Sequence, residues 1–184
     1  MIEILIKLDQ SILLTIQEYL RTPILTFIFI MFTTFGNSGV IWILISMGLL
    51  IFKKTRKVGI ISLCALCGSG IINNGILKHL VGRVRPFDVI WGLNVLIPKP
   101  NDFSFPSGHT ASSFAAASIL FRKLPKKYGI PAIILASMIS FSRLYVGVHY
   151  PSDVLFGMVI GILISYLTEF CVDILLNILT EKNR

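Results

Sequence analysis

The sequence predicts an all-α integral membrane protein, a bundle of about six transmembrane helices with an amphipathic helix at its N-terminal end. Hydrophobic residues make up 54% of the 184 residues and charged residues only 14%, where a soluble domain is about a quarter charged. The mean hydropathy is +0.81. The apolar residues form long blocks separated by short polar or basic clusters, which is typical of membrane spans. The length predicts a single domain over 1–184.

The first 22 residues mix apolar side chains with polar and charged ones. This pattern predicts a helix over 1–22 that lies at the membrane interface, and Pro23 begins a new segment. The N-terminus lacks the ordered charged, apolar and small-residue regions of a cleaved signal peptide, so we expect none.

Six apolar blocks follow, at 24–35, 39–52, 58–77, 109–124, 130–148 and 151–176. The first two are separated by Gly36 and Asn37 and are short for a hydrocarbon core of about 30 Å. The segment 78–108 is different, because it is polar and holds four of the eight prolines. We therefore expect it to be a loop outside the membrane.

The net charge of +8 does not indicate nucleic acid as a partner. The basic residues lie in short clusters between apolar blocks, and no nucleic-acid-binding motif is present. The loops 53–57 and 122–127 hold four basic residues each, which predicts that they are cytoplasmic. With six spans, both termini are then cytoplasmic and the loop 78–108 faces outside.

Cysteine usage predicts neither a disulfide framework nor a metal site. Cys64 and Cys67 form a CxxC pair inside an apolar block, and a zinc ion would need two further ligands. We expect these cysteines to be structural, and we expect no metal and no cofactor.

Three segments place ionisable residues at the ends of predicted spans, where they are functional candidates by default. These segments are KHLVGRVRP (Lys78–Pro86), FPSGHT (Phe105–Thr110) and SRLYVGVHYPSD (Ser142–Asp153). Six alternating spans place all three at the same membrane face.

In the third segment, Pro151 suits the first position of a helix and puts Asp153 within reach of His149. A carboxylate on one imidazole nitrogen fixes the tautomer and leaves the other nitrogen free to attack. Arg143 can bind phosphate oxygens with two hydrogen bonds.

In the second segment, Ser107 is a favoured N-cap and Gly108 allows a close backbone approach. The free N–H groups of a helix start bind anions, and His109 lies in the first turn of that helix. The first segment adds Lys78, whose ammonium group is a compact positive charge, and Arg85, whose planar guanidinium can bind two phosphate oxygens at once. Two histidines among three cations suit phosphoryl transfer, whereas acidic ligands for a metal are too few.

These motifs resemble those of the type 2 phosphatidic acid phosphatase family of integral membrane lipid phosphatases, whose site is similar to that of vanadium haloperoxidases. The family pattern K-x6-RP, PSGH and SR-x5-H-x3-D is matched in order and without substitution. The resemblance implies that His149 is the nucleophile, that Asp153 orients it and that His109 protonates the leaving oxygen. It also implies phosphate binding by Lys78, Arg85, Ser107, Gly108 and Arg143.

The resemblance implies a single membrane-embedded phosphatase domain in a bacterial plasma membrane, acting without metal at the outer face on a lipid phosphate or diphosphate. Our first choice of activity is undecaprenyl diphosphate phosphatase. The alternatives are a phosphatidate or phosphatidylglycerophosphate phosphatase, a lipid phosphotransferase, or a catalytically silent lipid-binding or transport protein. The partners expected are the lipid substrate and the bilayer, with no obligate protein partner.

Other polar residues near these motifs receive ordinary structural interpretations. We expect His79 and Arg83 to be loop residues without a catalytic part. Asn73 and Asn74, in the third apolar block, are expected to make interhelical hydrogen bonds. The aromatic residues Trp91, Tyr145 and Tyr150 are expected to anchor at the membrane interface.

Overall fold

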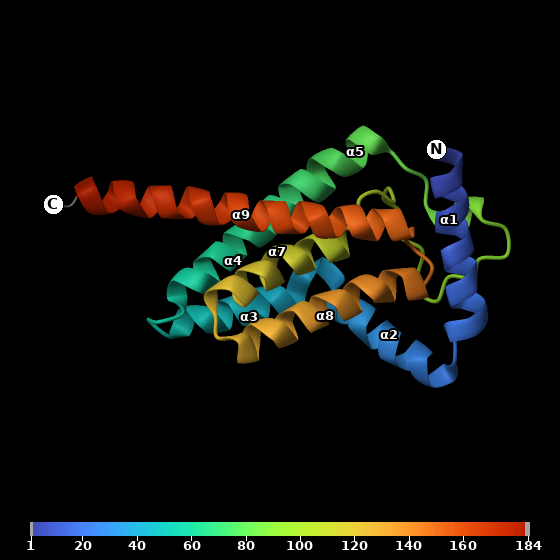
Figure 1. Cartoon of the computed structure of the whole chain (residues 1–184), viewed down its shortest axis with the longest axis horizontal. Coiled ribbons are helices and arrows are strands. Elements are labelled where there is room, and N and C mark those ends of the chain that lie inside the picture. Colours follow the sequence, from blue (N-terminus) through green and yellow to red (C-terminus); the bar gives the residue numbers. More distant parts are fainter. Residues whose placement is uncertain (1, 183–184) are drawn as a thin grey trace.

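The computed structural model describes residues 2–182, and their regular structure is entirely helical (Figure 1). Its α-helices are α1 (Ile2–Thr15), α2 (Pro23–Phe35), α3 (Val40–Ile51), α4 (Arg56–Ser69), α5 (Lys78–Val81), α6 (Pro86–Val89), α7 (Gly108–Lys123), α8 (Lys126–Tyr145) and α9 (Pro151–Lys182). A wider π-helical turn ends α1 at Ile16–Leu20, and another, Gly70–Leu77, joins α4 to α5.

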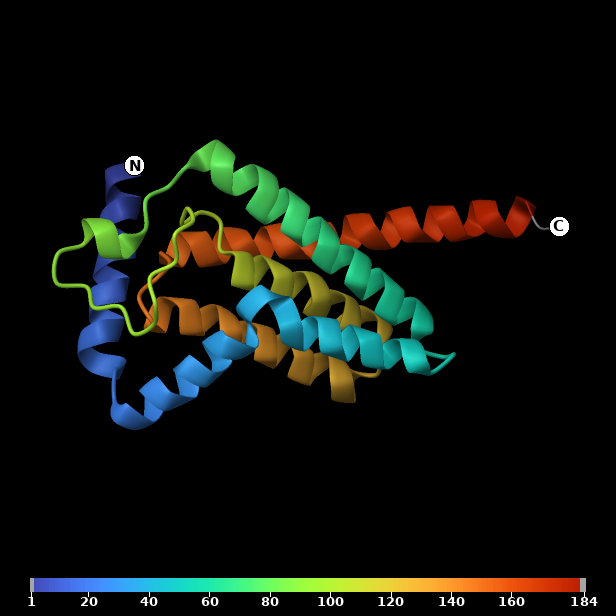
Figure 2. The same ribbon diagram turned by 180° about the vertical axis from the view of Figure 1, so that it is seen from behind.

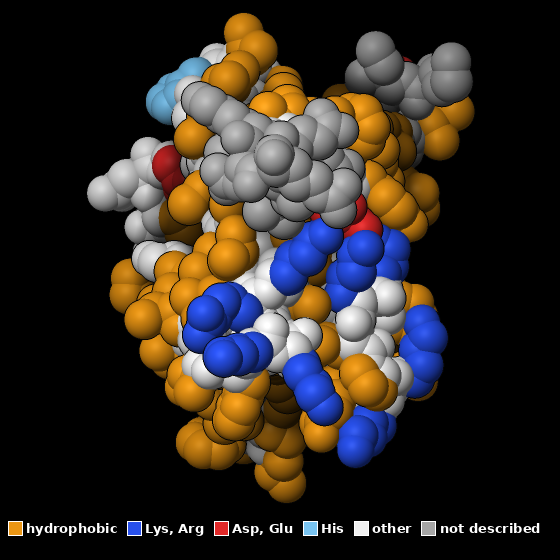
Figure 3. Space-filling view, turned by 90° about the vertical axis from the view of Figure 1, so that its left-hand side faces the viewer, with side chains coloured by type: hydrophobic (Ala, Val, Ile, Leu, Met, Phe, Trp, Pro, Cys, Tyr) orange, Lys and Arg blue, Asp and Glu red, His pale blue; other side chains and the backbone are white. Residues whose placement is uncertain are grey.

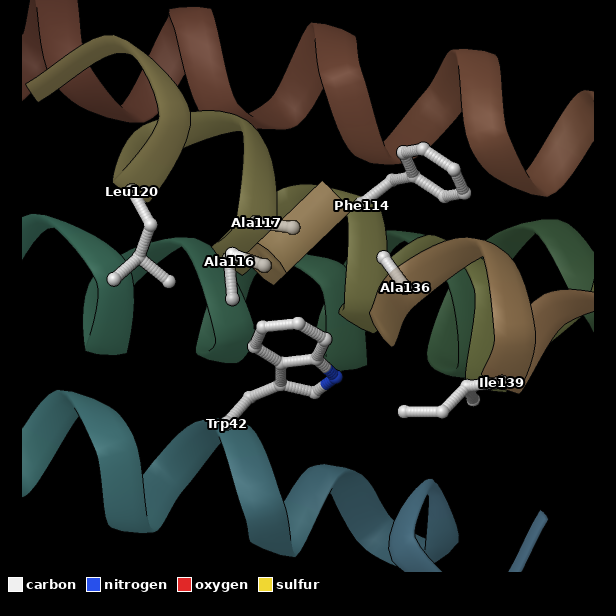
Figure 4. Close-up of a cluster of buried hydrophobic side chains, with 8 residues drawn as sticks. Trp42, Phe114, Ala116, Ala117, Leu120, Ala136 and Ile139 are labelled. Carbon is white, nitrogen blue, oxygen red and sulfur yellow. The ribbon is translucent and has the colours of Figure 1, made fainter. Parts of the chain in front are cut away.

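Helix α7 forms the centre of the bundle and packs against α4, α8 and α9. Its alanine- and serine-rich sequence is buried almost throughout, which explains why a central membrane helix needs little hydrophobicity of its own. The side chain of Trp42 on α3 fills the space beside these small residues and donates a 2.9 Å hydrogen bond to Ser113 (Figure 4).

Helices α7 and α9 approach each other closely through small residues. A Cβ atom on Gly161 would lie 2.4 Å from the carbonyl oxygen of Ala111, so only glycine fits there. Gly157 and Gly161 form the G-x3-G spacing that allows membrane helices to pack backbone against backbone. This contact fixes the start of α9, which carries Asp153, beside the start of α7.

The two short apolar blocks 24–35 and 39–52 do not form two antiparallel spans. Helices α2 and α3 meet at a 52° bend and continue in the same general direction along the bundle (Figures 1 and 2). The break is a tight turn at Asn37–Gly39 in which Ser38 and Gly39 have positive φ angles of 51° and 66°. The polar turn residues that predicted a loop therefore make a kink instead.

The prediction of six spans is not confirmed. Three helical segments of the described chain are long and apolar enough to cross a membrane, or up to four if α2 and α3 are counted as one bent span. Helix α7, with 16 residues, is about 24 Å long and runs inside the bundle beside the longer helices.

The two ends of the bundle differ in charge and content. The loops 53–57 and 122–127 lie at one end, where Lys57 pairs with Asp173 and Arg122 with Glu169 on α9. Figure 3 shows lysine and arginine side chains gathered on that face. Helix α1 and the segment 82–107 lie at the opposite end (Figure 2). Helix α1 and the end of α9 lie at opposite ends of the bundle (Figures 1 and 2), whereas six spans would place both at the same end.

Candidate functional site

A cavity of about 1010 Å³ opens among α2, α3, α4, α7 and the segment 96–102. Residues from all three sequence motifs line it, although they lie up to 71 positions apart along the chain. The expected site residues on its wall are Lys78, Arg85, Gly108, His109, Arg143 and His149.

His149 and Asp153 are held together by the start of α9. Pro151 begins the helix, and its first turn brings a carboxylate oxygen of Asp153 to 3.4 Å from Nδ1 of His149. The same oxygen accepts hydrogen bonds from the backbone N–H of Tyr150, at 3.0 Å, and from the hydroxyl of Ser104. Asp153 is fully buried behind the histidine, so its orientation is set entirely by protein groups.

The second ring nitrogen of His149 faces the cations of the cavity. Its Nε2 atom lies 3.4 Å from Nη1 of Arg85, which also donates a 2.7 Å hydrogen bond to the carbonyl oxygen of Val148. Burial lowers the pKa of His149 to about 4, against the raising effect of its contact with Asp153. His149 is therefore neutral at pH 7, and the tautomer with its proton on Nδ1, toward Asp153, leaves a lone pair on Nε2.

Arg85 and Lys78 share one anionic partner, Asp102. Nη2 of Arg85 donates a 2.6 Å hydrogen bond to one carboxylate oxygen, and Nζ of Lys78 contacts the other. Burial acts to raise the pKa of Asp102, but the two cations outweigh it and hold the pKa at about 2. A carboxylate thus lies between the two cations where phosphate oxygens are expected.

Arg143 is 2% exposed and lines the same cavity. Its Nη1 atom donates to the hydroxyl of Thr33 on α2, whereas its Nε has no hydrogen-bond partner in the part of the chain that the structure describes. A guanidinium on the wall of a cavity is suited to bind an incoming anion.

The start of α7 presents backbone groups to the cavity. Ser107 occupies the N-cap position, but its hydroxyl does not cap the helix; it accepts a 3.0 Å hydrogen bond from Thr110, and Ser107 is not on the cavity wall. Gly108 is on the wall, where a Cβ atom would lie 2.6 Å from the side-chain oxygen of Asn74. Glycine therefore avoids a clash with Asn74 at the start of α7, where the first N–H groups have no partner within the helix.

His109 is positioned by the bend between α2 and α3. Its Nε2 atom lies 3.0 Å from the side-chain oxygen of Asn37, the first residue of the tight turn. The kink that sequence reasoning took for a loop between two spans thus delivers a hydrogen-bond acceptor to this histidine.

Sequence reasoning missed several residues that contact the expected site. Asn37, Asp102 and Ser104 lie in turns or irregular segments, whose side-chain directions no periodicity predicts. Arg83 was interpreted as a plain loop residue, yet its Nη1 donates a 2.6 Å hydrogen bond to Asp153. Asp9 belongs to the segment 1–22 that was predicted to lie at the membrane interface, yet it is 3% exposed and pairs with Arg83 at 2.8 Å.

Other expectations have mixed outcomes. Asn73 does make a contact between segments, donating a 3.3 Å hydrogen bond to the carbonyl oxygen of Pro106.

Cys64 and Cys67 are free thiols, and Cys67 lines the cavity. Within residues 2–182, no three histidine, cysteine or acidic side chains are close enough together to hold a metal ion. Metal independence of the reaction itself stays a prediction.

The fold and the site together define a class of protein: an all-α membrane protein with a cavity lined by basic and polar residues from the three sequence motifs. Residues 59–174 match the PAP2 superfamily, and the chain belongs to it as a membrane lipid phosphatase. The chain is 36% identical over 151 residues to the undecaprenyl-diphosphatase of Sulfolobus acidocaldarius, covering 82% of this chain and 72% of that protein.

Two solved structures share this fold. The PAP2-type phosphatidylglycerolphosphate phosphatase from Bacillus subtilis matches with a TM-score of 0.74 and 28% identity, over 91% of this chain and 85% of that one. A bacterial vanadium-dependent iodoperoxidase matches with a TM-score of 0.68 and 17% identity, over 87% of this chain and 48% of that one. This chain therefore shares its fold with a vanadium-dependent haloperoxidase, and the similarity of the two sites stays a prediction.

Proposed function

We propose that this chain removes the terminal phosphate of undecaprenyl diphosphate at the outer face of the membrane. The observation that carries the proposal is the position of His149, whose Nε2 lies 3.4 Å from Arg85 on the wall of a cavity that also has an apolar side. The identity of 36% to an undecaprenyl-diphosphatase supports the choice of substrate.

The first chemical step forms a phosphohistidine. The lone pair of His149 Nε2 attacks the terminal phosphorus, and the bond from that phosphorus to the bridging oxygen breaks. His109 gives a proton to the departing lipid phosphate. Arg85, Arg143 and Lys78 stabilise the charge that spreads over the equatorial oxygens, and Asp153 holds the Nδ1 proton of the imidazole.

The second step releases inorganic phosphate. His109, now without its proton, accepts one from a water molecule, and the resulting hydroxide attacks the phosphorus. The P–N bond breaks, and the electron pair returns to Nε2 of His149. His109 thereby regains the proton that it needs for the next turnover.

The apolar wall accounts for the lipid part of the substrate. Ile30 from α2, Ile43 from α3 and Leu63 and Leu66 from α4 line the cavity beside the polar residues. A polyprenyl chain can lie against this wall within the bilayer while its diphosphate reaches the cations, so the substrate enters sideways from the lipid.

The proposed orientation follows from the charge at the two ends of the bundle. The basic loops 53–57 and 122–127 are at one end and, by the positive-inside rule, this end is cytoplasmic. The segment 82–107 and the helix α1 are then outside. This side suits recycling of a cell-wall carrier lipid.

The rival activities act on other lipid phosphates. A phosphatidylglycerophosphate phosphatase is supported by the 28% identity to the Bacillus subtilis structure. A phosphatidate phosphatase needs the same phosphate site. A phosphotransferase would use the same phosphohistidine and pass the phosphate to a lipid hydroxyl instead of water.

A phosphate-release panel tests the proposal. The purified protein, in detergent with EDTA and no added divalent ion, is assayed on undecaprenyl diphosphate, phosphatidate, phosphatidylglycerophosphate and a soluble sugar phosphate, with and without an acceptor lipid. His149→Ala is the matched inactive control. We expect the highest kcat/KM on undecaprenyl diphosphate. A preference for either phospholipid would overturn the substrate, and activity that requires magnesium would overturn the mechanism.

A further inference from the structure

The N-terminal helix α1 reaches the site through one buried acid, Asp9. We infer that Asp9 and Arg83 are positioning residues, which hold Asp153 in place and so keep His149 in its reactive orientation. The inference rests on the proposed function, because it concerns the same nucleophile. It makes α1, which lies outside the matched superfamily region of 59–174, a working part of the active site.

Arg83 bridges two buried carboxylates. Its Nη1 donates a 2.6 Å hydrogen bond to Oδ1 of Asp153, and its Nη2 donates a 2.8 Å hydrogen bond to Oδ2 of Asp9. Its guanidinium also lies 3.8 Å from the centre of the Tyr150 ring. The planar fork of arginine fixes both acids at once, which a lysine ammonium cannot do.

Asp9 reaches Asp153 by a second route, through the backbone of α9. Its Oδ1 accepts a 3.0 Å hydrogen bond from the backbone N–H of Ser152, and its Oδ2 accepts one from the hydroxyl of Ser152. Ser152 is in the first turn of α9, where N–H groups have no partner within the helix. The acid of α1 therefore caps the helix turn that carries Asp153.

The burial of these groups shows that the network is internal. Asp9 is 3% exposed, Ser152 6% and Asp153 0%. Without Arg83, two carboxylates would be close together in a buried site, and Asp153 could relax away from His149. The 3.4 Å contact between His149 and Asp153 is long for a hydrogen bond, so small shifts of the carboxylate decide whether it orients the ring.

The turn that follows α1, Ile16–Leu20, and the next residue, Arg21, are fastened in a way that keeps Asp9 in place. Gln17 donates a 2.9 Å hydrogen bond to the carbonyl oxygen of Gly92 and accepts one of 2.7 Å from the N–H of Asn94. Arg21 donates to the carbonyl oxygens of Asn94 and Tyr145 at 2.7 and 2.8 Å. Helix α1 is thus tied to the active-site segment and to the end of α8.

The test is a double-mutant cycle between Asp9→Asn and Asp153→Asn, assayed as kcat and KM on an activated aryl phosphate. Asp9→Asn alone should lower kcat by about 10- to 100-fold, as loss of an outer partner does at metal sites. KM and the vanadate inhibition constant should change little, because the phosphate-binding cations are untouched. In the Asp153→Asn background the same change should have almost no further effect, because Asp9 acts through Asp153.

Two further variants complete the experiment. Arg83→Lys keeps the positive charge but loses the planar guanidinium that donates to Asp9 and Asp153 at once. It should therefore reproduce most of the decrease in kcat that Arg83→Gln causes. Asp173→Asn breaks the 2.8 Å pair with Lys57 at the other end of the bundle and should keep the wild-type kcat.

The outcomes separate this inference from the proposed function. If wild type and Asp173→Asn release no phosphate from any substrate, the proposed function fails. If they are active and Asp9→Asn is equally active, the inference alone is overturned. The same fold decrease in kcat for Asp9→Asn in the wild-type and Asp153→Asn backgrounds would also overturn the inference. Independent effects on kcat multiply, so that result would mean that Asp9 does not act through Asp153.

Discussion

Arg85 and Asp102 form a 2.6 Å ion pair inside the cavity where a phosphate is expected to bind. Lys78 contacts the other oxygen of the same carboxylate. The two cations are therefore not free in this structure, and an incoming phosphate has to compete with Asp102 for both of them. An anion that displaces Asp102 loses the free energy of these two ion pairs, so its affinity for the site is lower by that amount.

Asp102→Asn should for this reason strengthen inhibition by orthovanadate. The amide keeps the size of the side chain and removes the competing charge, and a charge-assisted hydrogen bond is worth about 1.5–3 kcal/mol. We expect the vanadate inhibition constant to fall about tenfold, the factor that corresponds to about 1.4 kcal/mol. Asp88→Asn, which removes an exposed acid from the same segment, should leave it unchanged. Weaker vanadate inhibition in Asp102→Asn would mean that Asp102 positions the cations instead of competing for them.

The protonation state of His149 can be observed directly, because the chain has only three histidines. Nucleophilic attack needs the neutral ring, and the lowered pKa of about 4 keeps the ring neutral from pH 8 down to about pH 5. NMR of ¹⁵N-labelled imidazoles in detergent, with His149→Ala to assign the signal, should show one neutral tautomer protonated at Nδ1 over that range. A His149 signal that titrates near 6.5 would contradict this prediction.

Because α2 and α3 form one bent span, α1 lies at the end of the bundle opposite the basic loops. If the end with the basic loops is cytoplasmic, position 101 and the start of α1 are outside, whereas position 53 is inside. In a background with the three native cysteines replaced by alanine, single cysteines at positions 3, 101 and 53 are treated with an impermeant thiol reagent in intact cells. Positions 3 and 101 should react and position 53 only after lysis. The reverse result would place the site in the cytoplasm.

The sequence predicted the class of fold and the basic residues of the cavity wall for different reasons. Apolar blocks and basic clusters indicate membrane helices directly. Pro151 predicts the start of a helix two residues after His149, and the first turn of that helix brings Asp153 back to the His149 ring. Asn37 could not be assigned in the same way. A Gly-Asn-Ser-Gly run reads equally as a loop or as a kink, and only the packing of α2 and α3 against α7 and α8 decides between them.

Long-range polar partners were the least predictable part of the site. Asp9 lies on a helix that the sequence predicts to be amphipathic and interfacial, and its partner in the structure, Arg83, is 74 positions away. Asp102 is in a proline-rich segment without periodicity, so nothing local indicates where its carboxylate points. Ser107 illustrates the opposite case, because its N-cap position was predictable but its hydroxyl bonds to Thr110 instead of the helix.

The two histidines should differ in how their loss depends on the leaving group. His149→Ala should abolish turnover of every substrate and leave no phosphoenzyme. His109→Ala should lose more activity on a lipid monoester than on an activated aryl phosphate, because a lipid alkoxide needs the proton and general acid help is worth about 10²–10⁴-fold. With the activated substrate, His109→Ala should also accumulate phosphohistidine, since hydrolysis of the intermediate needs His109 as base.

Asn37→Ala should reproduce part of this pattern, because the side-chain oxygen of Asn37 is 3.0 Å from Nε2 of His109 and orients the ring. The measurement is kcat on the monoester and on the aryl phosphate for wild type, His109→Ala, Asn37→Ala and Thr34→Ala. Thr34 is the matched control, since it also lines the cavity but its hydroxyl donates only to the carbonyl oxygen of Ile30. We expect a greater loss on the monoester for Asn37→Ala and equal, small losses for Thr34→Ala. Equal losses on both substrates for His109→Ala and Asn37→Ala, with no trapped intermediate, would mean that His109 only positions phosphate and that the bend serves the fold alone.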